Sequence, residues 1–322
     1  MGCATSRENG QRLRWSVAEK KLVWQSKLVL LVVMPFVGAD VVLETHWWAA
    51  QAAPVAIWTV GLSVLLGLVT WKLRAATPWA AAAGTAITAS LMFSTVAFPY
   101  EVWHTALMPV LAVAVLAFVS TVLGRGKKER LGTAENRRGR SASQVAANLG
   151  VAAIMSSEFV QSWFIDSHWF ARATLSPMLM FTAGLAALAE AAADTASSEL
   201  GQVFGGRPRM ITTLRQVDPG RDGAVSLAGT LLGVVAAGIV AAAGALAFQG
   251  GVAMFWISCA GGVFGLLFDS LLGATLEERG WLNNDGVNFL STMSAAGLAL
   301  AVLALIPHSV GGIDLSFPSG PH

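Results

Sequence analysis

Acidic side chains stand beside hydroxyl and amide side chains at three points where a long apolar segment begins or ends. These groups are Glu190 with Asp194-Thr195-Ala196-Ser197-Ser198-Glu199, Asp269-Ser270, and Asn283-Asn284-Asp285 with Asn288. Glu190 and Asp194 are four residues apart, so they share a helix face. Oxygen ligands of these kinds are those that Mg²⁺ prefers, and ionisable residues at the edge of membrane spans usually serve a function. The alternative is that each group only caps or solvates a helix end.

Basic side chains fill two of the segments between the apolar ones. They are Lys127, Lys128, Arg130, Arg137, Arg138 and Arg140 in the first segment, and Arg207, Arg209, Arg215 and Arg221 in the second. The second segment is also rich in glycine. Arginine binds phosphate through two hydrogen bonds, and glycine backbone can approach phosphate closely. Acid and base at one membrane edge suit a nucleotide–metal complex, whereas the alternative is the ordinary attraction of basic residues to anionic lipids.

Other kinds of catalytic site find little support in the sequence. The five histidines fall on the external side in the topology derived below, so the cytoplasmic groups contain none: His46, His104, His168, His308 and His322. The segment Gly124-Arg125-Gly126-Lys127-Lys128 has the wrong spacing for a P-loop and lacks the following Ser or Thr. Nucleophile elbows and paired-histidine protease motifs are absent. Cys3 and Cys259 predict no disulfide framework.

The elements that must position these groups are apolar helices. Hydrophobic residues make up 55% of the 322-residue chain and charged residues 12%, against roughly 25% charged residues in a soluble domain. A helical span needs roughly 20 apolar residues. The sequence offers nine candidate spans: 27–43, 52–71, 79–97, 104–123, 144–164, 174–193, 223–247, 251–272 and 287–308. It therefore predicts an all-α fold, a polytopic membrane helix bundle with about nine transmembrane helices.

The distribution of lysine and arginine predicts the orientation of the bundle. If the N-terminus is cytoplasmic and nine spans alternate, all 21 Lys and Arg residues except Arg172 face the cytoplasm, as the positive-inside rule requires. The chain then has a basic cytoplasmic tail over residues 1–26, a transmembrane domain over 27–308 and a flexible external tail over 309–322. A net charge of +2 implies no nucleic-acid partner. We expect an integral protein of a bacterial inner (cytoplasmic) membrane.

Two glycine pairs occur in the seventh and eighth candidate spans. Gly229 and Gly233 form one pair, and Gly261 and Gly265 form the other. Small residues at this four-residue spacing let helices pack closely, which is the expected role. A smooth groove that holds a lipid chain is the alternative.

In their order along the chain, the polar motifs resemble an integral-membrane family that includes the plastid phytyl-phosphate kinase and many uncharacterised bacterial and archaeal members. The similarity runs from about residue 79 to about residue 292. Its motifs are the basic loop leading into Gln144-Val145-Ala146-Ala147-Asn148, Ala193-Asp194-Thr195 with Ser198-Glu199, Ile211-Thr212, Val217, Pro219-Gly220, Val225-Ser226 with Gly229-Thr230, Asp269-Ser270-Leu271-Leu272-Gly273-Ala274-Thr275, and Asn284-Asp285 with Val287-Asn288. The ordered set is specific, whereas each piece alone is weak.

The chain departs from the family pattern at two places. Ala196 follows Ala-Asp-Thr where the family usually has tryptophan. Gly220-Arg221-Asp222-Gly223-Ala224 stands where the family usually has Gly-Thr-x-Gly-Gly. The second departure lies in the expected phosphate loop, so it leaves the choice of nucleotide and lipid open.

The resemblance implies a membrane-embedded kinase acting at the cytoplasmic face. Such an enzyme transfers a phosphoryl group, with Mg²⁺, from CTP or another nucleoside triphosphate to an isoprenyl (phytyl-like) monophosphate. It implies that the residues that are catalytic and hold the metal are Asp194, Glu199 and Asp269. It implies that the residues that bind and position the phosphates are Lys128, Arg138, Asn148, Arg207, Arg221, Ser226, Thr230, Asn284 and Asn288. The acceptor's own phosphate attacks, so no protein nucleophile is required.

Two other classes of function stay open. A cytidylyltransferase acting on a lipid phosphate would use the same metal and nucleotide site but release pyrophosphate. A transporter would place polar residues near the membrane midplane on broken helices. The partners expected for the enzyme are the isoprenyl phosphate, the nucleotide and membrane lipids, while the oligomeric state is left open.

Overall fold

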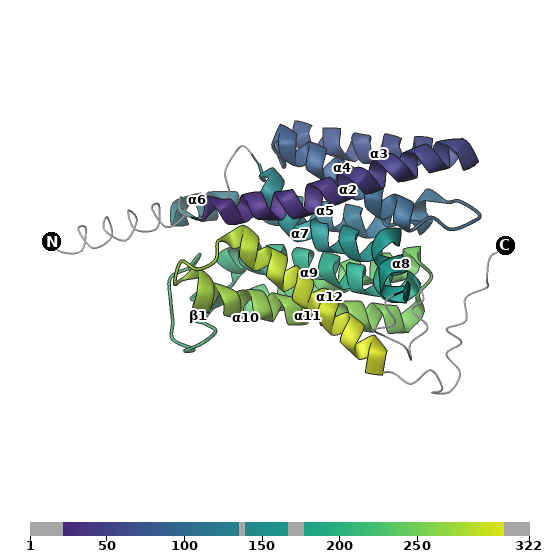
Figure 1. The fold of residues 1–322 in the computed structure, drawn as a ribbon. Coiled ribbons are helices and arrows are strands. Elements are labelled where there is room, and N and C mark those ends of the chain that lie inside the picture. The colour runs from purple at the N-terminus through teal and green to yellow at the C-terminus, as the bar shows by residue number, and fades with distance from the viewer. Residues whose placement is uncertain (1–21, 135–138, 167–176, 306–322) are drawn as a thin grey trace, which may run out of the picture.

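The computed structural model describes residues 22–134, 139–166 and 177–305, which are almost entirely helical. The α-helices are α2 (Val23–Gln51), α3 (Ala53–Lys72), α4 (Pro78–Ser94), α5 (Leu107–Val122), α6 (Arg125–Leu131), α7 (Ala142–Ser156), α8 (Glu158–Asp166), α9 (Pro177–Phe204), α10 (Leu227–Ala247), α11 (Gly251–Leu272) and α12 (Asn284–Leu305). The short elements are the 3-10 turn η1 (Val102–His104), the π-helical turn η2 (Gly273–Glu277), and the antiparallel strands β1 (Arg209–Met210) and β2 (Ala224–Val225). The predicted all-α membrane bundle is confirmed (Figure 1).

The number of spans is not confirmed as nine. Six described helices are long and apolar enough to cross a bilayer, namely α2, α3, α9, α10, α11 and α12. A seventh span exists if α5 and α6, which meet at a 60° bend, are counted as one. At the other predicted positions α4 has 17 residues and α7 has 15. The fifth predicted span is broken because α7 ends at Ser156 and α8 begins at Glu158.

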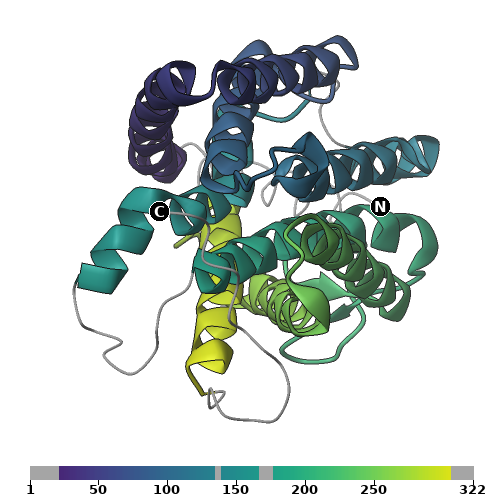
Figure 2. The same cartoon turned by 90° about the vertical axis from the view of Figure 1, so that its right-hand side faces the viewer.

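Helix α9 is the centre of the bundle. It packs against α5, α7, α10, α11 and α12, and 78% of its apolar window is buried, against 39% or less in the other five long helices. Most of its buried positions are alanine, so the helix is thin enough for five neighbours to surround it. In the turned view, the N-terminal helices drawn in purple and blue lie on one side of the bundle and the green and yellow C-terminal helices on the other (Figure 2).

The two glycine pairs pack α10 and α11 against α9, as predicted. A Cβ added at Gly233 would lie 2.9 Å from the carbonyl oxygen of Ala193. A Cβ added at Gly265 would lie 2.5 Å from Cγ of Glu190. Gly233 therefore lets the backbone of α10 approach the backbone of α9, and Gly265 leaves room on α11 for the Glu190 side chain of α9.

Polar caps determine where α7 and α10 begin. Gln144 N donates to Ser141 Oγ at 3.2 Å, and Ser141 N donates to Gln144 Oε1 at 2.8 Å, which makes a reciprocal capping box. Gly229 N donates to Ser226 Oγ at 3.1 Å. The basic segment before Ser141 and the glycine-rich segment before Ser226 thus join the bundle at defined helix starts.

The acidic and basic motifs meet at one end of the bundle, here called the loop end. This end carries α6, the β1–β2 hairpin and the first turns of α2 and α12, whereas α8 lies at the opposite end (Figure 1). Gln25 in α2 donates through Nε2 to the Trp281 carbonyl at 2.8 Å and accepts from Asn283 N at 2.8 Å. At the loop end, the start of α2 is therefore tied to the connection between η2 and α12. Its cytoplasmic orientation stays a prediction.

Several predicted features lie partly or wholly outside the described residues. The N-terminal tail predicted over 1–26 ends earlier, because α2 begins at Val23. The remainder of that tail, Arg138, Arg172 and the C-terminal tail over 309–322 are not among the described residues.

Candidate active site

A polar cavity with a volume of about 240 Å³ lies at the loop end. It is formed by the C-terminal half of α9, the start of α10, the end of α11 with η2, and the loop before β2. Its charged lining residues are Asp194, Arg221, Asp222, Asp269 and Glu277. Its lining also contains the hydroxyl and amide side chains of Ser197, Ser198, Gln202, Ser226, Ser270 and Asn284. The structure therefore brings residues from all three acidic motifs and from the glycine-rich loop to one place.

The carboxylates of this cavity are crowded. When ionised, Asp194, Glu190 and Glu277 each repel an ionised Asp269. Oδ2 of Asp269 is buried and has no hydrogen-bond partner among the described residues. Buried negative charge without a partner is costly. A cation, or a complex that carries one, is the ligand that such a cluster favours.

Glu190 also belongs to this cluster, although it was not among the predicted site residues. It lies one turn before Asp194 on α9 and is 1% exposed. Its Oε1 also has no hydrogen-bond partner within the described ranges. The available signal was its four-residue spacing from Asp194 inside an apolar segment. Only a glycine at position 265 leaves room for its side chain against α11.

The donor set fits Mg²⁺ bound together with phosphates better than a closed protein metal site. Among the described residues, no group of three or more His, Cys, Asp or Glu side chains is arranged to hold a metal ion. Mg²⁺ typically keeps several waters and is bound by one or two carboxylates plus substrate phosphates. Asp194 and Asp269 supply two carboxylates in one cavity, and Oδ2 of Asp269 is a buried oxygen without a partner in the described part of the chain.

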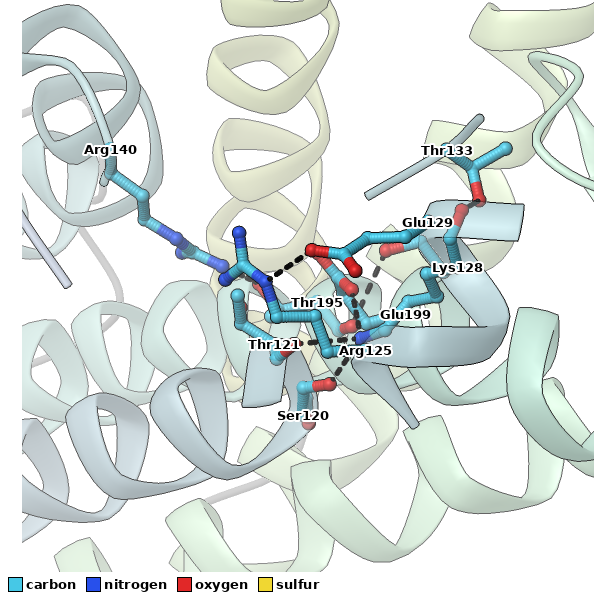
Figure 3. A network of polar contacts seen from close by, with 10 residues as sticks. Ser120, Thr121, Arg125, Lys128, Glu129, Thr133, Arg140, Thr195 and Glu199 are labelled. Carbon is cyan, nitrogen blue, oxygen red and sulfur yellow. Dashed lines mark hydrogen bonds and ion pairs between the residues drawn. The ribbon is translucent and has the colours of Figure 1, made fainter. Parts of the chain in front are cut away.

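Lys128 and Glu199 bind each other and are not among the residues that line the polar cavity. Lys128 Nζ donates to Glu199 Oε2 at 2.5 Å. It also donates to the carbonyl oxygens of Ser120 at 2.7 Å and Thr121 at 3.0 Å (Figure 3). Lys128 is 1% exposed, and its ammonium group has acceptors for all its protons. The pair ties α6 to α9, so the predicted metal role of Glu199 and phosphate role of Lys128 would require it to open.

Two glycines in the left-handed conformation let the predicted phosphate loop lie at the polar cavity. Gly220 has φ 85° and Gly223 has φ 72°, and a Cβ on Gly223 would lie 2.4 Å from Cβ of Ala274 in η2. Arg221 Nε donates to Glu278 Oε1 at 2.5 Å. This hydrogen bond raises the pKa of Arg221 and ties the loop to the end of η2. Arg221 itself is part of the cavity lining.

The remaining predicted phosphate-binding residues are divided. Ser226 and Asn284 line the polar cavity. Arg207 is exposed and Thr230 is half-buried, and neither is part of that lining. Arg138 is outside the described residues.

A second cavity, with a volume of about 430 Å³, lies between α3, α4, α5 and α7. Most of its lining is apolar. Asn148 lines it and accepts a hydrogen bond from Asn288 Nδ2 at 2.9 Å. These two predicted residues therefore meet at the contact between α7 and α12, and only Asn148 reaches the second cavity. The sequence does not predict this cavity, because residues from four helices form it.

Arg140 lies between the two cavities. It lines the second cavity together with Arg74 and Arg125. Its Nη2 donates to Thr195 Oγ1 at 3.3 Å (Figure 3), and its positive charge acts on Asp194. The only sequence signal for Arg140 was its membership of a basic segment.

The family profile described as integral membrane protein DUF92 matches residues 61–296. The match begins inside α3, earlier than the predicted start near residue 79, and ends inside α12. Every residue that lines either cavity falls within it. No solved structure matches the chain.

Three relatives illustrate how far the similarity extends. An uncharacterized membrane protein of Methanocaldococcus jannaschii is 43% identical over 109 residues, which cover 34% of this chain and 45% of the relative. An uncharacterized membrane protein of Synechocystis sp. is 32% identical over 204 residues, which cover 61% of this chain and 72% of the relative. Protein VTE6, chloroplastic, of Arabidopsis thaliana is 28% identical over 198 residues, so the match spans 60% of this chain and only 56% of that relative. The chain belongs to the DUF92 family of integral membrane proteins.

Proposed function

We propose that the protein is a Mg²⁺-dependent phosphotransferase that moves a phosphoryl group from CTP or another nucleoside triphosphate to an isoprenyl monophosphate. The observation that carries the proposal is the polar cavity, in which Asp194 and Asp269 share a lining with Arg221. Carboxylates for a metal and arginine for phosphate are what a nucleoside triphosphate–magnesium complex requires. The resemblance to the family of the plastid phytyl-phosphate kinase supports an isoprenyl phosphate as the acceptor.

The reaction requires no nucleophilic side chain. An oxygen of the acceptor phosphate forms a bond to the γ-phosphorus, and the bond from that phosphorus to the β–γ bridging oxygen breaks. The bridging oxygen leaves on the nucleoside diphosphate, and the lipid product is an isoprenyl diphosphate. Mg²⁺, when bound, neutralises charge on the β- and γ-phosphates.

The side chains of this cavity position and neutralise the reactants. Asp194 and Asp269 hold the metal, and the mutual repulsion of the buried carboxylates falls when the metal–nucleotide complex binds. Arg221 and the backbone of the glycine loop hold nucleotide phosphates. Such preorganised charges act most strongly where charge moves in the transition state.

The direct test incubates purified protein with Mg²⁺, CTP or ATP, and a panel of prenyl monophosphates. Parallel reactions carry label on the α- or the γ-phosphate, and products are separated by charge. The proposal expects γ-label in a prenyl diphosphate, and none when excess chelator is present. Transfer of α-label to the lipid with release of pyrophosphate would show a cytidylyltransferase instead. Absence of any labelled lipid from folded protein would exclude both enzymes for the substrates tested and favour the transporter.

A further inference from the structure

The second cavity, between α3, α4, α5 and α7, is elongated along the bundle and is called the apolar slot below. It follows α5 from Val110 to Val122, which is about 18 Å at 1.5 Å per residue. Its volume of about 430 Å³ lies in the range of roughly 300–1,000 Å³ of small-molecule sites. Its walls include the apolar side chains of Leu66, Val113, Ala117, Phe118, Val145 and Leu149. Such a slot suits a hydrocarbon chain.

The loop end of this slot is positively charged. Arg74, Arg125 and Arg140 line it there. Arg140 N donates to the Ala75 carbonyl at 3.0 Å, and a Cβ at Gly139 would lie 2.6 Å from the Arg74 carbonyl oxygen. Arg74 has φ 56°, an unfavourable conformation for a residue other than glycine. The backbone therefore holds two arginines side by side at the mouth of an apolar slot.

The charged mouth adjoins the polar cavity. Arg140 Nη2 donates to Thr195 Oγ1 at 3.3 Å, and Asp194 is the preceding residue. Helix α9 contributes Ala191 to the apolar slot and Asp194 to the polar cavity, three residues apart. A phosphate on Arg140 would thus lie beside the carboxylates assigned to the metal. Transfer requires this proximity, because reacting atoms must come within about 3–3.5 Å.

We infer that the slot is the acceptor site and binds a single-chain prenyl monophosphate. The chain lies between α4, α5 and α7, and the phosphate lies on Arg74 and Arg140. The identity of this ligand as a substrate rests on the proposed function. A phosphate monoester carries about −1.5 to −2 charges at neutral pH, which matches the positive charges of Arg74 and Arg140, while Arg125 is paired with Glu129 at 3.2 Å. The diester of a common two-chain phospholipid carries a single charge and has two chains for one slot.

The test measures binding of a radiolabelled prenyl monophosphate to the full chain in detergent, without nucleotide or Mg²⁺. Ala117→Trp fills the slot from α5, and Arg74→Gln removes a charge at its mouth. Each variant should weaken binding at least about tenfold. Arg74→Gln removes a charge-assisted contact to the phosphate, and Ala117→Trp removes the space for the prenyl chain. Two matched controls should bind like the wild type. They are Val115→Trp, which is exposed on the same helix, and Lys72→Gln, a basic neighbour outside the slot lining.

The alternative outcomes would overturn the inference. Wild-type affinity in Ala117→Trp would place the lipid elsewhere, and so would equal competition by phosphatidylglycerol. A photoreactive prenyl monophosphate tests the same site in the unmodified protein. Label is expected on α5 or α7, and label confined to other helices would contradict the slot. Phosphoryl transfer plays no part in these measurements. Binding that depends on the slot, without any kinase activity, would therefore contradict the proposed function but still support the lipid site.

Discussion

At the scale of single residues, Asp194 and Asp269 offer the sharpest test of the polar cavity. Changing either to Asn removes a charge with little change in shape. Turnover should fall at least about a hundredfold for each variant, because a charge aimed at the moving phosphoryl group is lost. Turnover of the double variant should be little lower than that of the more impaired single variant, since residues that hold one complex act as a unit. Steady-state turnover with saturating nucleotide measures this.

Glu101→Gln is the control for these variants. Glu101 lies in the connection between α4 and α5, where it accepts a hydrogen bond from Trp103 Nε1 at 2.9 Å, and it lines neither cavity. Its turnover should stay within a few-fold of the wild type. Near-normal turnover of Asp194→Asn together with greatly reduced turnover of Glu101→Gln would show that the active site is not the polar cavity at the loop end.

The ion pair between Lys128 and Glu199 should matter for stability. Lys128→Met leaves the Glu199 carboxylate, whose side chain is 13% exposed, without its cation, and should cost about 3–5 kcal/mol. The double variant Lys128→Met/Glu199→Gln should recover much of that loss. Thermal unfolding in detergent checks both. If Glu199 instead holds the metal, Glu199→Gln would raise the Mg²⁺ concentration needed for nucleotide binding while hardly changing the unfolding temperature.

Asp222 should make stability depend on pH. Burial raises the pKa of Asp222 above its ordinary value of 3.8, and the charge of Glu278 adds to the effect, while Arg221 opposes it. The folded protein therefore binds this proton more tightly than the unfolded chain does. The free energy of unfolding contributed by this group falls as pH rises from 3.8 through the raised pKa.

Asp222→Asn should consequently raise the unfolding temperature at pH 7, and the gain should shrink as the pH falls through the raised pKa. Unfolding temperatures of both proteins across that pH range give the result. Asp218 is exposed in the same loop, so Asp218→Asn should shift the unfolding temperature little anywhere in that pH range. An Asp222→Asn gain that grows on acidification would show that the carboxylate is stabilising rather than costly.

At the scale of elements, the approach of α10 to α9 depends on glycine at one helix face. Gly233→Ala places a Cβ 2.9 Å from the Ala193 carbonyl oxygen and 2.8 Å from Leu266 Cδ2. Backbone cannot yield locally, so the helices must separate, at a cost of about 1–3 kcal/mol. Gly238→Ala on the same helix meets nothing within 4 Å and should be neutral or slightly stabilising. Equal loss of unfolding temperature in the two variants would contradict this packing.

At the scale of the whole molecule, the untested property is which side of the membrane the loop end faces. In a background with Cys3 and Cys259 replaced by Ser, a cysteine at exposed Thr212 in the β1–β2 segment should react only with reagent supplied from the cytoplasm. A cysteine at exposed Ala97, between α4 and α5, should react only from outside. Labelling of intact cells and of inverted vesicles distinguishes the two. The reverse pattern would move the polar cavity to the external face, away from cytoplasmic nucleotide.

Much of the architecture could be read from the sequence because it depends on local properties. The length of each apolar segment specifies where a helix runs, and the two glycine pairs, which include Gly233 and Gly265, specify which helix faces pack closely. Asp194, Asp269 and Arg221 could be expected near one another, since each stands where an apolar segment meets a polar one and alternating helices return such ends to the same side. The division of the fifth predicted span into α7 and α8 was not predicted, because hydropathy does not reveal the break after Ser156.

The neighbours of each side chain were decided only by tertiary packing. Lys128 meets Glu199 across 71 residues of sequence, so a predicted phosphate-binding residue and a predicted metal ligand are found bound to each other. Arg140 meets Thr195, and residues of α3, α4, α5 and α7 together enclose the apolar slot. A sequence records which groups sit at helix ends, but the order of helices around α9 determines which of those groups share a cavity.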